Sequence, residues 1–377
     1  MPTVINLRDQ PDPRDAVHRA VQALVEGKVV ALPTDTVYGL AASALKPEAV
    51  EAIYEIKGRS FDAPLALSVT SGEAAVDFLS DPSPLGLRLL TRATPGPITL
   101  VLPGEGPQSA VTHLPDAVRK RVIGPGGCVG FRIIRHRVIE HVHRLMSAPL
   151  VLTSANVSGS DAPTNADGVM EQFGDASPER LPLVLDDGPT RYGGASTVVR
   201  VQSDRYEILR PGAVEAAAIA QYAKPIITIV CTGNTCRSPM AETLLNDLLA
   251  RKLGRDDAAF VVSAGLAAGG GSGASPAAVE VMGRRKLDLT GHCSRPLDDE
   301  MMRQSDVVLT MTRGHRRAIL AAWPMLSERV HTLRHDGGDV TDPVGSPVEV
   351  YEACAEQIEH ELEAWIDLWR GGLLPSV

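Results

Sequence analysis

Two cysteines and an arginine lie within seven residues in the stretch CTGNTCRS, from Cys231 to Ser238. The apolar residues 226–230 before it predict a buried strand, and the pattern after it predicts a helix with Ser238 at the N-cap and Pro239 in the first turn. A loop between a strand end and a helix N-terminus presents backbone N–H groups and a positive dipole, which bind phosphate. The same environment favours the thiolate, so Cys231 is the predicted nucleophile.

The other residues of this stretch fit the same chemistry. Arg237 can donate two parallel hydrogen bonds to phosphate oxygens, which lysine cannot do. Glycine and asparagine tolerate the left-handed backbone that a tight loop demands, and the serine hydroxyl is placed to bond the thiolate. The alternatives are two small apolar core residues or a metal site, but no second Cys or His pair is nearby. The predicted phosphate loop contains Thr232, Gly233, Asn234, Thr235, Cys236 and Ser238.

The elements that must position this loop predict an α/β protein of two domains. The 377 residues exceed what one hydrophobic core usually supports. Short apolar runs rich in β-branched residues alternate with helical patterns along the whole chain. An alanine-rich stretch interrupts them, so we expect a domain at 1–213, a linker at 214–224 and a second domain at 225–373. One apolar stripe predicts a closing helix through Tyr351, Cys354, Ile358, Leu362, Trp365 and Trp369.

Composition narrows the function classes. The formal net charge is −9, which argues against sequence-independent binding along a nucleic-acid backbone. No stretch reaches the ~20 apolar residues of a membrane span, and the N-terminus lacks a signal-peptide core. Five cysteines in a long chain indicate reduced thiols. We therefore expect a cytoplasmic protein without a membrane partner.

Three further features are expected to be structural only. His141 and His143 lack metal-site spacing, which favours a solvated helix face. Two glycine-rich stretches, at 124–130 and 265–276, lack the flanking pattern of a dinucleotide-binding fingerprint and are expected to be flexible loops.

The pattern C-x5-R-S-P followed by Met-Ala-Glu resembles the low-molecular-weight protein-tyrosine-phosphatase family over residues 225–369. The resemblance implies a three-layer α/β/α domain with a parallel sheet, and a general acid on a late Asp-Pro loop, here Asp342. By that resemblance Cys231 carries a phosphocysteine intermediate, and Asp342 protonates the leaving group and then activates water, without metal. A separate hypothesis pairs Cys236 with Cys231 in a reversible, protective disulfide.

The substrate of this site is the open question. Tyrosine-specific members usually place aromatic residues after Asp-Pro, where this chain has Val344 and Gly345, and a bulky aliphatic residue at the position of Thr235. The loop with threonine is similar to the protein-arginine-phosphatase branch. Thiol-dependent arsenate reductases need two downstream cysteines, of which only Cys293 is present. We expect phosphoproteins carrying phosphoarginine as substrates, with phosphotyrosine as the alternative.

The N-terminal domain contains Lys57 and Arg59, two cations that could hold a polyphosphate. Together with polar blocks at strand ends they resemble the threonylcarbamoyl-AMP synthase family over residues 5–213, which implies a twisted mixed sheet. That family joins L-threonine, bicarbonate and ATP with Mg²⁺, releases pyrophosphate and serves tRNA modification, so tRNA or the tRNA threonylcarbamoyl transferase is an expected partner. The resemblance assigns ATP to Lys57, Arg59, Asn156, Thr164 and Arg210, and threonine to Thr36, Arg132, Ser154 and Ser196.

Two positions depart from the pattern of that family. Ala63 precedes Pro64 where asparagine is usual, and Ser68 stands where a histidine is expected near the amino-acid carboxylate. These departures bear on threonine binding. The alternative function for this domain is a module that binds nucleotide or RNA without synthesis.

Overall fold

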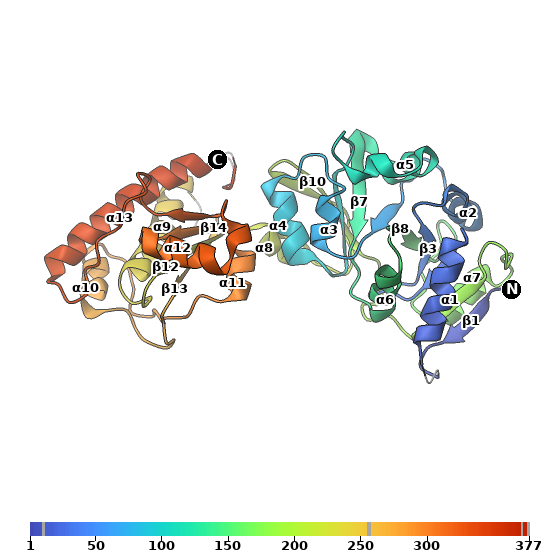
Figure 1. The fold of residues 1–377 in the computed structure, drawn as a ribbon, viewed down its shortest axis with the longest axis horizontal. Helices are drawn as coiled ribbons and strands as arrows, with labels where there is room; N and C mark the ends of the chain where they lie inside the picture. The colour runs from blue at the N-terminus through green and yellow to red at the C-terminus, as the bar shows by residue number, and fades with distance from the viewer. Residues whose placement is uncertain (10–11, 255–257, 371, 375–377) are drawn as a thin grey trace. The chain divides into compact units, whose positions relative to one another are not determined.

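The computed structural model describes residues 1–9, 12–254, 258–370 and 372–374. It divides into two compact units, Met1–Ala223 and Lys224–Val377, and both are α/β as predicted (Figure 1). No helix in the described ranges combines the length and the apolar character that crossing a membrane requires.

The N-terminal unit is built on a mixed sheet, which confirms the predicted architecture. Its order is β1-β9-β2-β3-β8-β4-β7-β5-β10-β11, with β6 paired to β7, and parallel and antiparallel pairs alternate irregularly. The strands are β1 (Thr3–Asn6), β2 (Val30–Leu32), β3 (Gly39–Ser43), β4 (Ala66–Ser68), β5 (Ile98–Pro103), β6 (Ile123–Gly124), β7 (Cys128–Arg132), β8 (Leu150–Ser154), β9 (Leu183–Asp186), β10 (Thr197–Gln202) and β11 (Arg205–Arg210).

Helices cover both faces of this sheet. Buried residues of α1 and α6 form one apolar cluster, and those of the other α-helices join a larger cluster on the opposite face. The helices are α1 (Arg14–Val25), α2 (Pro47–Lys57), α3 (Gly72–Val76), α4 (Pro84–Ala93), α5 (Asp116–Val122), α6 (Arg137–Leu145), α7 (Ala166–Phe173) and α8 (Ala216–Ala223), with 3-10 turns η1 (Ala110–His113) and η2 (Pro125–Gly127).

The segment expected to be a linker, 214–224, is mostly the helix α8. Its Ile219 is fully buried in the larger core cluster of the N-terminal unit, and the Arg88 guanidinium donates to the Ala223 carbonyl. This alanine-rich sequence is therefore helical and belongs to the first unit. Alanine favours a helix when one large apolar residue on it finds a core.

Side chains that alternate along three neighbouring strands face the core on one side of the sheet and a cavity on the other. On β5, Leu100 points to the larger core while Thr99 and Val101 are only partly buried. β10 alternates in the same way, and on β7 Val129 and Phe131 join the core while Gly130 and Arg132 line the cavity. Because successive side chains of a strand point to opposite faces, these three strands present one row of side chains to the core and another to a cavity.

The glycine-rich segment 124–130 is not simply a flexible loop. It contains the η2 turn, in which Gly126 and Gly127 adopt φ of 71° and 69°, and then the first residues of β7. Segment 265–276 does connect β13 to α10 without regular structure.

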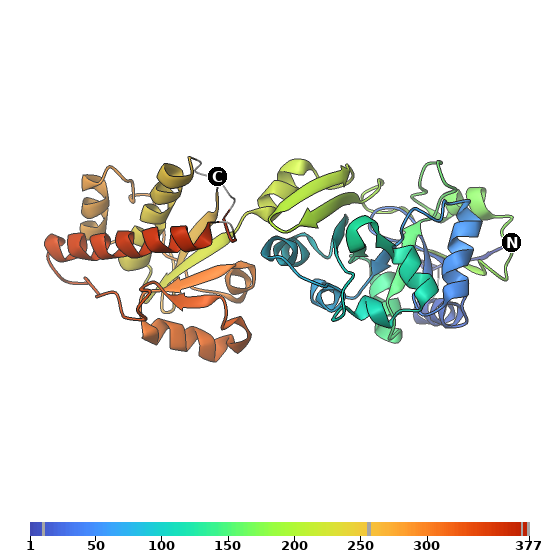
Figure 2. The ribbon, with the colours of Figure 1, turned by 90° about the horizontal axis from the view of Figure 1, so that it is seen from above.

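The C-terminal unit has three layers, as predicted. Its four-stranded sheet is parallel throughout, in the order β13-β12-β14-β15. Helices α9, α10 and α13 lie on one face and α11 and α12 on the other (Figure 2). The elements are β12 (Ile226–Cys231), β13 (Phe260–Gly265), β14 (Val307–Thr310), β15 (Val330–Thr332), α9 (Arg237–Leu253), α10 (Pro276–Arg284), α11 (Asp299–Gln304), α12 (Arg313–Ala322) and α13 (Val348–Trp369), with the 3-10 turn η3 (Pro324–Leu326).

The closing helix α13 buries the predicted stripe. All six of its residues are buried, and Trp365 also donates its indole N–H to the Leu333 carbonyl, 2.7 Å away. Burial of each large side chain in this stripe stabilises the unit by ~1.5–3 kcal/mol.

Candidate active sites

The predicted phosphate loop follows the central strand of the C-terminal sheet. β12 lies between β13 and β14 and ends at Cys231, and α9 begins at Arg237. In an open parallel sheet, ligands bind beyond the carboxyl ends of such central strands. The loop 232–236 therefore lies where the fold provides a binding site.

Cys231 is buried and surrounded by hydrogen-bond donors. Its Sγ lies 3.0 Å from Ser238 Oγ and 3.3 Å from the Asn234 backbone nitrogen. The predicted contact between Ser238 and the thiol is therefore present. The predicted helix start is wrong, however, because Cys236 occupies the N-cap position and Ser238 lies in the first turn. Ser238 faces Cys231 from the helix instead of capping it.

Asn234 organises the loop. Its φ of 55° is left-handed, which asparagine tolerates, whereas Gly233 does not adopt a positive φ. The side-chain Nδ2 of Asn234 donates to Ser238 Oγ and Ser263 Oγ at 3.0 and 2.8 Å. Its Oδ1 accepts from the Arg295 backbone N–H at 2.9 Å. A fully buried side chain with these three bonds fixes the loop backbone.

The loop leaves backbone donors for a ligand. Within the described residues, the N–H groups of Gly233, Thr235 and Cys236 take part in no hydrogen bond. Buried or half-buried N–H groups are normally paired, so a ring of unpaired ones next to a thiol is a site for an anion.

Arg237 and Asp342 lie together at this loop. Arg237 is buried, donates from Nη1 to the Val340 carbonyl at 3.2 Å and forms an ion pair from Nη2 with Asp342. The Asp342 side chain is 44% exposed and also accepts from the Val344 backbone. A buried guanidinium and a half-exposed carboxylate thus meet at the C-terminal end of the phosphate loop.

Cys236 contacts α13 through Tyr351. Its Sγ lies 3.5 Å from the Tyr351 hydroxyl and 3.7 Å from Thr235 Oγ1. Burial raises the pKa of Tyr351, so the phenol remains protonated and neutral. Cys231 and Cys236 are both free thiols here, and the disulfide between them remains a hypothesis.

Two histidines at this site were missed from the sequence. His292 Nε2 lies 2.7 Å from the Asn234 carbonyl, and His315 Nε2 lies 2.9 Å from Thr232 Oγ1. They come from segments 58 and 83 residues downstream of their partners. No local sequence pattern predicts these two contacts, because only the parallel sheet brings the segments that contain the histidines to the loop.

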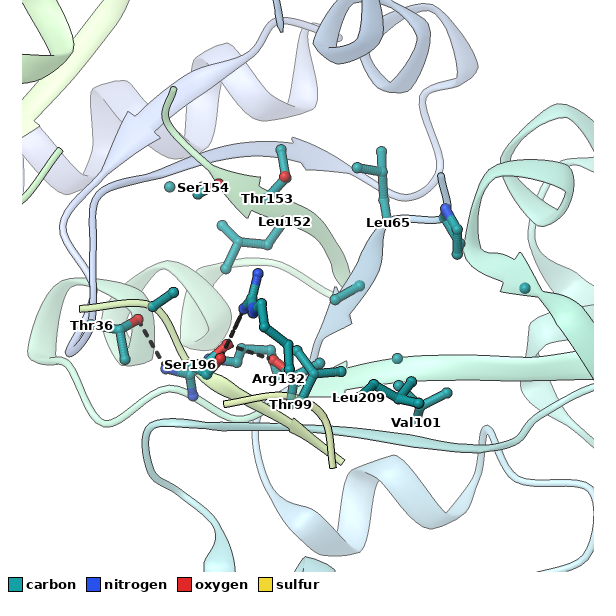
Figure 3. A pocket seen from close by; sticks show the side chains of 18 of the residues that line it. Thr36, Leu65, Thr99, Val101, Arg132, Leu152, Thr153, Ser154, Ser196 and Leu209 are labelled. Atoms are coloured by element: carbon teal, nitrogen blue, oxygen red, sulfur yellow. Dashed lines mark hydrogen bonds between the residues drawn. The ribbon is translucent and has the colours of Figure 1, made fainter. Parts of the chain in front are cut away.

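The N-terminal unit encloses a cavity of about 320 Å³ beside β4, β5, β7 and β10. Polar Thr36, Thr99 and Ser196 gather at one end, and Val101 and Leu209 lie at the other (Figure 3). Of the predicted site residues, six line the cavity: Thr36, Arg59, Arg132, Ser154, Ser196 and Arg210.

Four arginines line this cavity, and no aspartate or glutamate does so among the described residues. Arg59 donates to the carbonyls of Ala63 and Pro64, and Arg210 to the Ser196 carbonyl at 2.8 Å. The guanidinium groups of Arg59 and Arg210 thus take oxygen partners without losing their positive charge, which suits an anionic ligand.

Arg200 is a cavity residue that the sequence analysis missed. It shares the cavity face of β10 with Val198. Its Nη1 lies 3.7 Å from Glu207 Oε2, and its Nε is buried without a partner among the described residues. The signal was available, because period-two alternation from Ser196 places residue 200 on the same face.

Arg132 forms a buried ion pair with Asp35. Both are almost fully buried, and Arg132 also contacts Thr36 Oγ1 at 3.3 Å and the Gly96 carbonyl. The second carboxylate oxygen of Asp35 has no partner among the described residues. Asp35 therefore orients the Arg132 guanidinium at the cavity wall.

Lys57, Asn156 and Thr164 do not line the cavity. Lys57 lies buried at the end of α2, where Gly58 ends the helix at φ 58°. Its Nζ donates to the carbonyls of Ser154 and Asn156, and burial lowers its pKa to about 7. Lys57 thus holds the end of β8 at Ser154 and the turn that follows it.

His143 corrects the expectation of a solvated helix face. It is buried on α6, and its Nε2 lies 3.0 Å from Ser68 Oγ. Burial lowers the pKa of His143 to about 4, so the ring is neutral at pH 7. At the position where the family pattern has a histidine, this chain instead pairs a serine with a histidine from another element.

A group of three His, Cys, Asp or Glu side chains that could hold a metal ion is absent from the described part of the chain. For the cavity this agrees with its lining, which offers no carboxylate oxygen, the ligand that Mg²⁺ takes from proteins.

Two family models match the chain. The Sua5/YciO/YrdC model, described as telomere recombination, matches residues 22–212, and the low molecular weight phosphotyrosine protein phosphatase model matches residues 226–370.

Individual relatives are similar to parts of the chain. The threonylcarbamoyl-AMP synthase of Pyrococcus abyssi is 32% identical over 259 residues, which are 65% of this chain and 72% of that protein. The protein-arginine-phosphatase of Bacillus subtilis is 38% identical over 140 residues, 36% of this chain and 91% of that protein. A solved structure of a Pyrococcus abyssi Sua5 variant covers 82% of this chain and 99% of its own, at 23% identity and a TM-score of 0.52, a likeness of fold alone.

Proposed function

Since the chain belongs to the Sua5/YciO/YrdC family over residues 22–212 and to the low-molecular-weight phosphotyrosine protein phosphatase family over residues 226–370, we propose that it is an enzyme with two activities. The N-terminal unit makes threonylcarbamoyl-AMP from L-threonine, bicarbonate and ATP for tRNA modification. The C-terminal unit hydrolyses phosphoproteins through a cysteine nucleophile.

The observation that carries the first activity is the cavity with four arginines and no carboxylate. Every substrate of the proposed reaction carries an anionic group: the triphosphate of ATP, bicarbonate itself and the carboxylate of threonine. Arg59, Arg200 and Arg210 would hold the phosphates, and Arg132 with Thr36 and Ser196 would hold threonine.

In the proposed chemistry, the threonine amine and bicarbonate first condense to a carbamate, with formation of an N–C bond and loss of water. A carbamate oxygen then attacks the α-phosphorus of ATP. A new P–O bond forms, the bond to the β-phosphate breaks, and pyrophosphate leaves. The arginines stabilise the charge that develops on the phosphate oxygens. Mg²⁺ would arrive with the ATP phosphates, and we assign it no protein ligand because the cavity offers no carboxylate.

Pyrophosphate release tests this activity. Release from ATP that requires both threonine and bicarbonate is the expected result. Tight binding of nucleotide or RNA without release of pyrophosphate would instead support the alternative of a binding module. In that alternative, Ser68 stands where the family has a histidine, and threonine activation has been lost.

The observation that carries the second activity is the Cys231 thiol, which lies between the Ser238 hydroxyl and the Asn234 N–H. These donors stabilise a thiolate that attacks the phosphorus atom. Arg237 and the unpaired loop N–H groups would hold the phosphate oxygens. Asp342 would protonate the leaving group and then take a proton from the water that hydrolyses phosphocysteine.

We propose phosphoarginine as the preferred substrate. Thr235 in the phosphate loop and the small Val344 after Asp-Pro support this choice, because neither side chain can pack against a phenyl ring as an aromatic or bulky aliphatic residue would. Turnover of phosphoarginine and phosphotyrosine peptides by the intact protein tests it. A clear preference for phosphotyrosine would overturn the choice of substrate without affecting the phosphatase activity itself.

A further inference from the structure

Thr232 is held from two sides although it is an exposed residue. Its carbonyl accepts from the Ala267 N–H at 2.9 Å, and its Oγ1 lies 2.9 Å from His315 Nε2. Ala267 follows β13, and His315 lies on α12, which follows β14. The residue next to the nucleophile is thus tied to both neighbours of the central strand β12.

His315 is itself fixed in place. Its backbone N–H donates to Thr312 Oγ1, the N-cap of α12, at 3.1 Å. The residue is only 9% exposed, and its Nδ1 is buried without a partner among the described residues. A buried nitrogen without a partner lowers the free energy of unfolding, so an apolar side chain would be expected here if the residue only filled space. The polar contact that offsets this cost is the one to Thr232.

We propose that His315 is a positioning residue of the phosphatase site, which holds Thr232 and thereby the first peptide of the phosphate loop in the conformation that binds phosphate. This inference rests on the proposed phosphatase function. An exposed loop residue without core packing would otherwise sample several conformations, and the adjacent N–H groups would not converge on one anion.

The role is positional and not electrostatic. Burial, and then the nearby positive charge of Arg237, lower the pKa of His315, while the carboxylates of Asp342 and Asp339 oppose this shift. The ring is therefore neutral at pH 7 and adds no charge to the site.

Three variants of the full chain test the proposal: His315→Ala, His315→Gln and Thr232→Val. The measurements are kcat and KM for p-nitrophenyl phosphate and the inhibition constant of inorganic phosphate. We expect His315→Ala to lower kcat/KM, and to weaken phosphate inhibition, by roughly three- to tenfold, the worth of one neutral hydrogen bond. His315→Gln, which can still reach Thr232, should recover most of this loss. The double variant His315→Ala/Thr232→Val should be no worse than either single variant.

His360→Ala, a change of an exposed histidine on α13, is the matched control and should match the wild type. Losses that multiply in the double variant, or a glutamine variant as poor as the alanine variant, would overturn the proposal. If His315→Ala does not fold by circular dichroism, Thr232→Val and His315→Gln decide. If the wild type turns over no substrate, the phosphatase function fails, and calorimetric phosphate affinities of the same variants decide the role of His315.

Discussion

Arg200 is the residue whose contribution to ATP binding can be measured most directly. Its guanidinium lines the cavity and leaves Nε unpaired among the described residues. A charge-assisted hydrogen bond is worth ~1.5–3 kcal/mol, so Arg200→Ala should raise KM for ATP by roughly 10- to 100-fold in the pyrophosphate assay. Arg205→Ala on the adjacent strand, whose side chain is 86% exposed, should leave KM unchanged. An equal KM in both variants would remove Arg200 from the nucleotide site.

His143 predicts a pH dependence of stability. Its pKa in the folded state is about 4, below the ordinary value of 6.5, so the unfolded chain binds the extra proton first as pH falls. Burial of the neutral His143 ring therefore makes the free energy of unfolding depend on pH. On the order of 3 kcal/mol of stability is present above pH 6.5 and is lost as the pH falls from about 6.5 to 4. His143→Gln should flatten this part of the pH profile of urea unfolding, whereas His141→Gln should not. A wild-type profile without this slope would contradict the burial of a neutral ring.

At the scale of elements, the end of β13 sets the shape of the phosphate loop. A Cβ on Gly265 would lie 2.6 Å from the Thr232 carbonyl oxygen and 2.9 Å from the Asn234 nitrogen. The strand and the loop approach so closely that only glycine fits.

Gly265→Ala should therefore displace the loop. Because a shift of about 1 Å at a reacting group can cost ~100-fold, we expect a loss of that order in phosphatase kcat/KM. Gly269→Ala, in the same connection but with no heavy atom within 4 Å of the added Cβ, is the control. Wild-type turnover by Gly265→Ala would show that the loop tolerates the shift.

At the scale of the whole molecule, we propose a separate active site in each unit. The Cys231→Ser variant of the intact chain should lose phosphatase turnover by at least about a thousandfold, because a serine hydroxyl is a far weaker nucleophile at neutral pH. Pyrophosphate release should be unchanged. A parallel fall in pyrophosphate release would instead reveal energetic coupling between the units.

The sequence by itself predicted the features that are local in the chain. The loop from Cys231 to Arg237 could be predicted because strand, nucleophile, arginine and helix start are consecutive, and so could the α13 stripe, because helical periodicity is a property of neighbours. Even there the helix start differed by two residues, since Ser238 turns toward the thiol.

Only the tertiary structure decided what long-range contacts bring together. His315 and His292 reach the phosphate loop, and His143 reaches Ser68, from elements 58 to 83 residues away. The four cavity arginines come from three strands and the turn after α2. Such partners have no mutual spacing in the sequence, because strand order in a mixed sheet does not follow chain order. The predicted reactive groups are close together in the sequence, whereas the groups that hold and orient them are brought together only by the sheet.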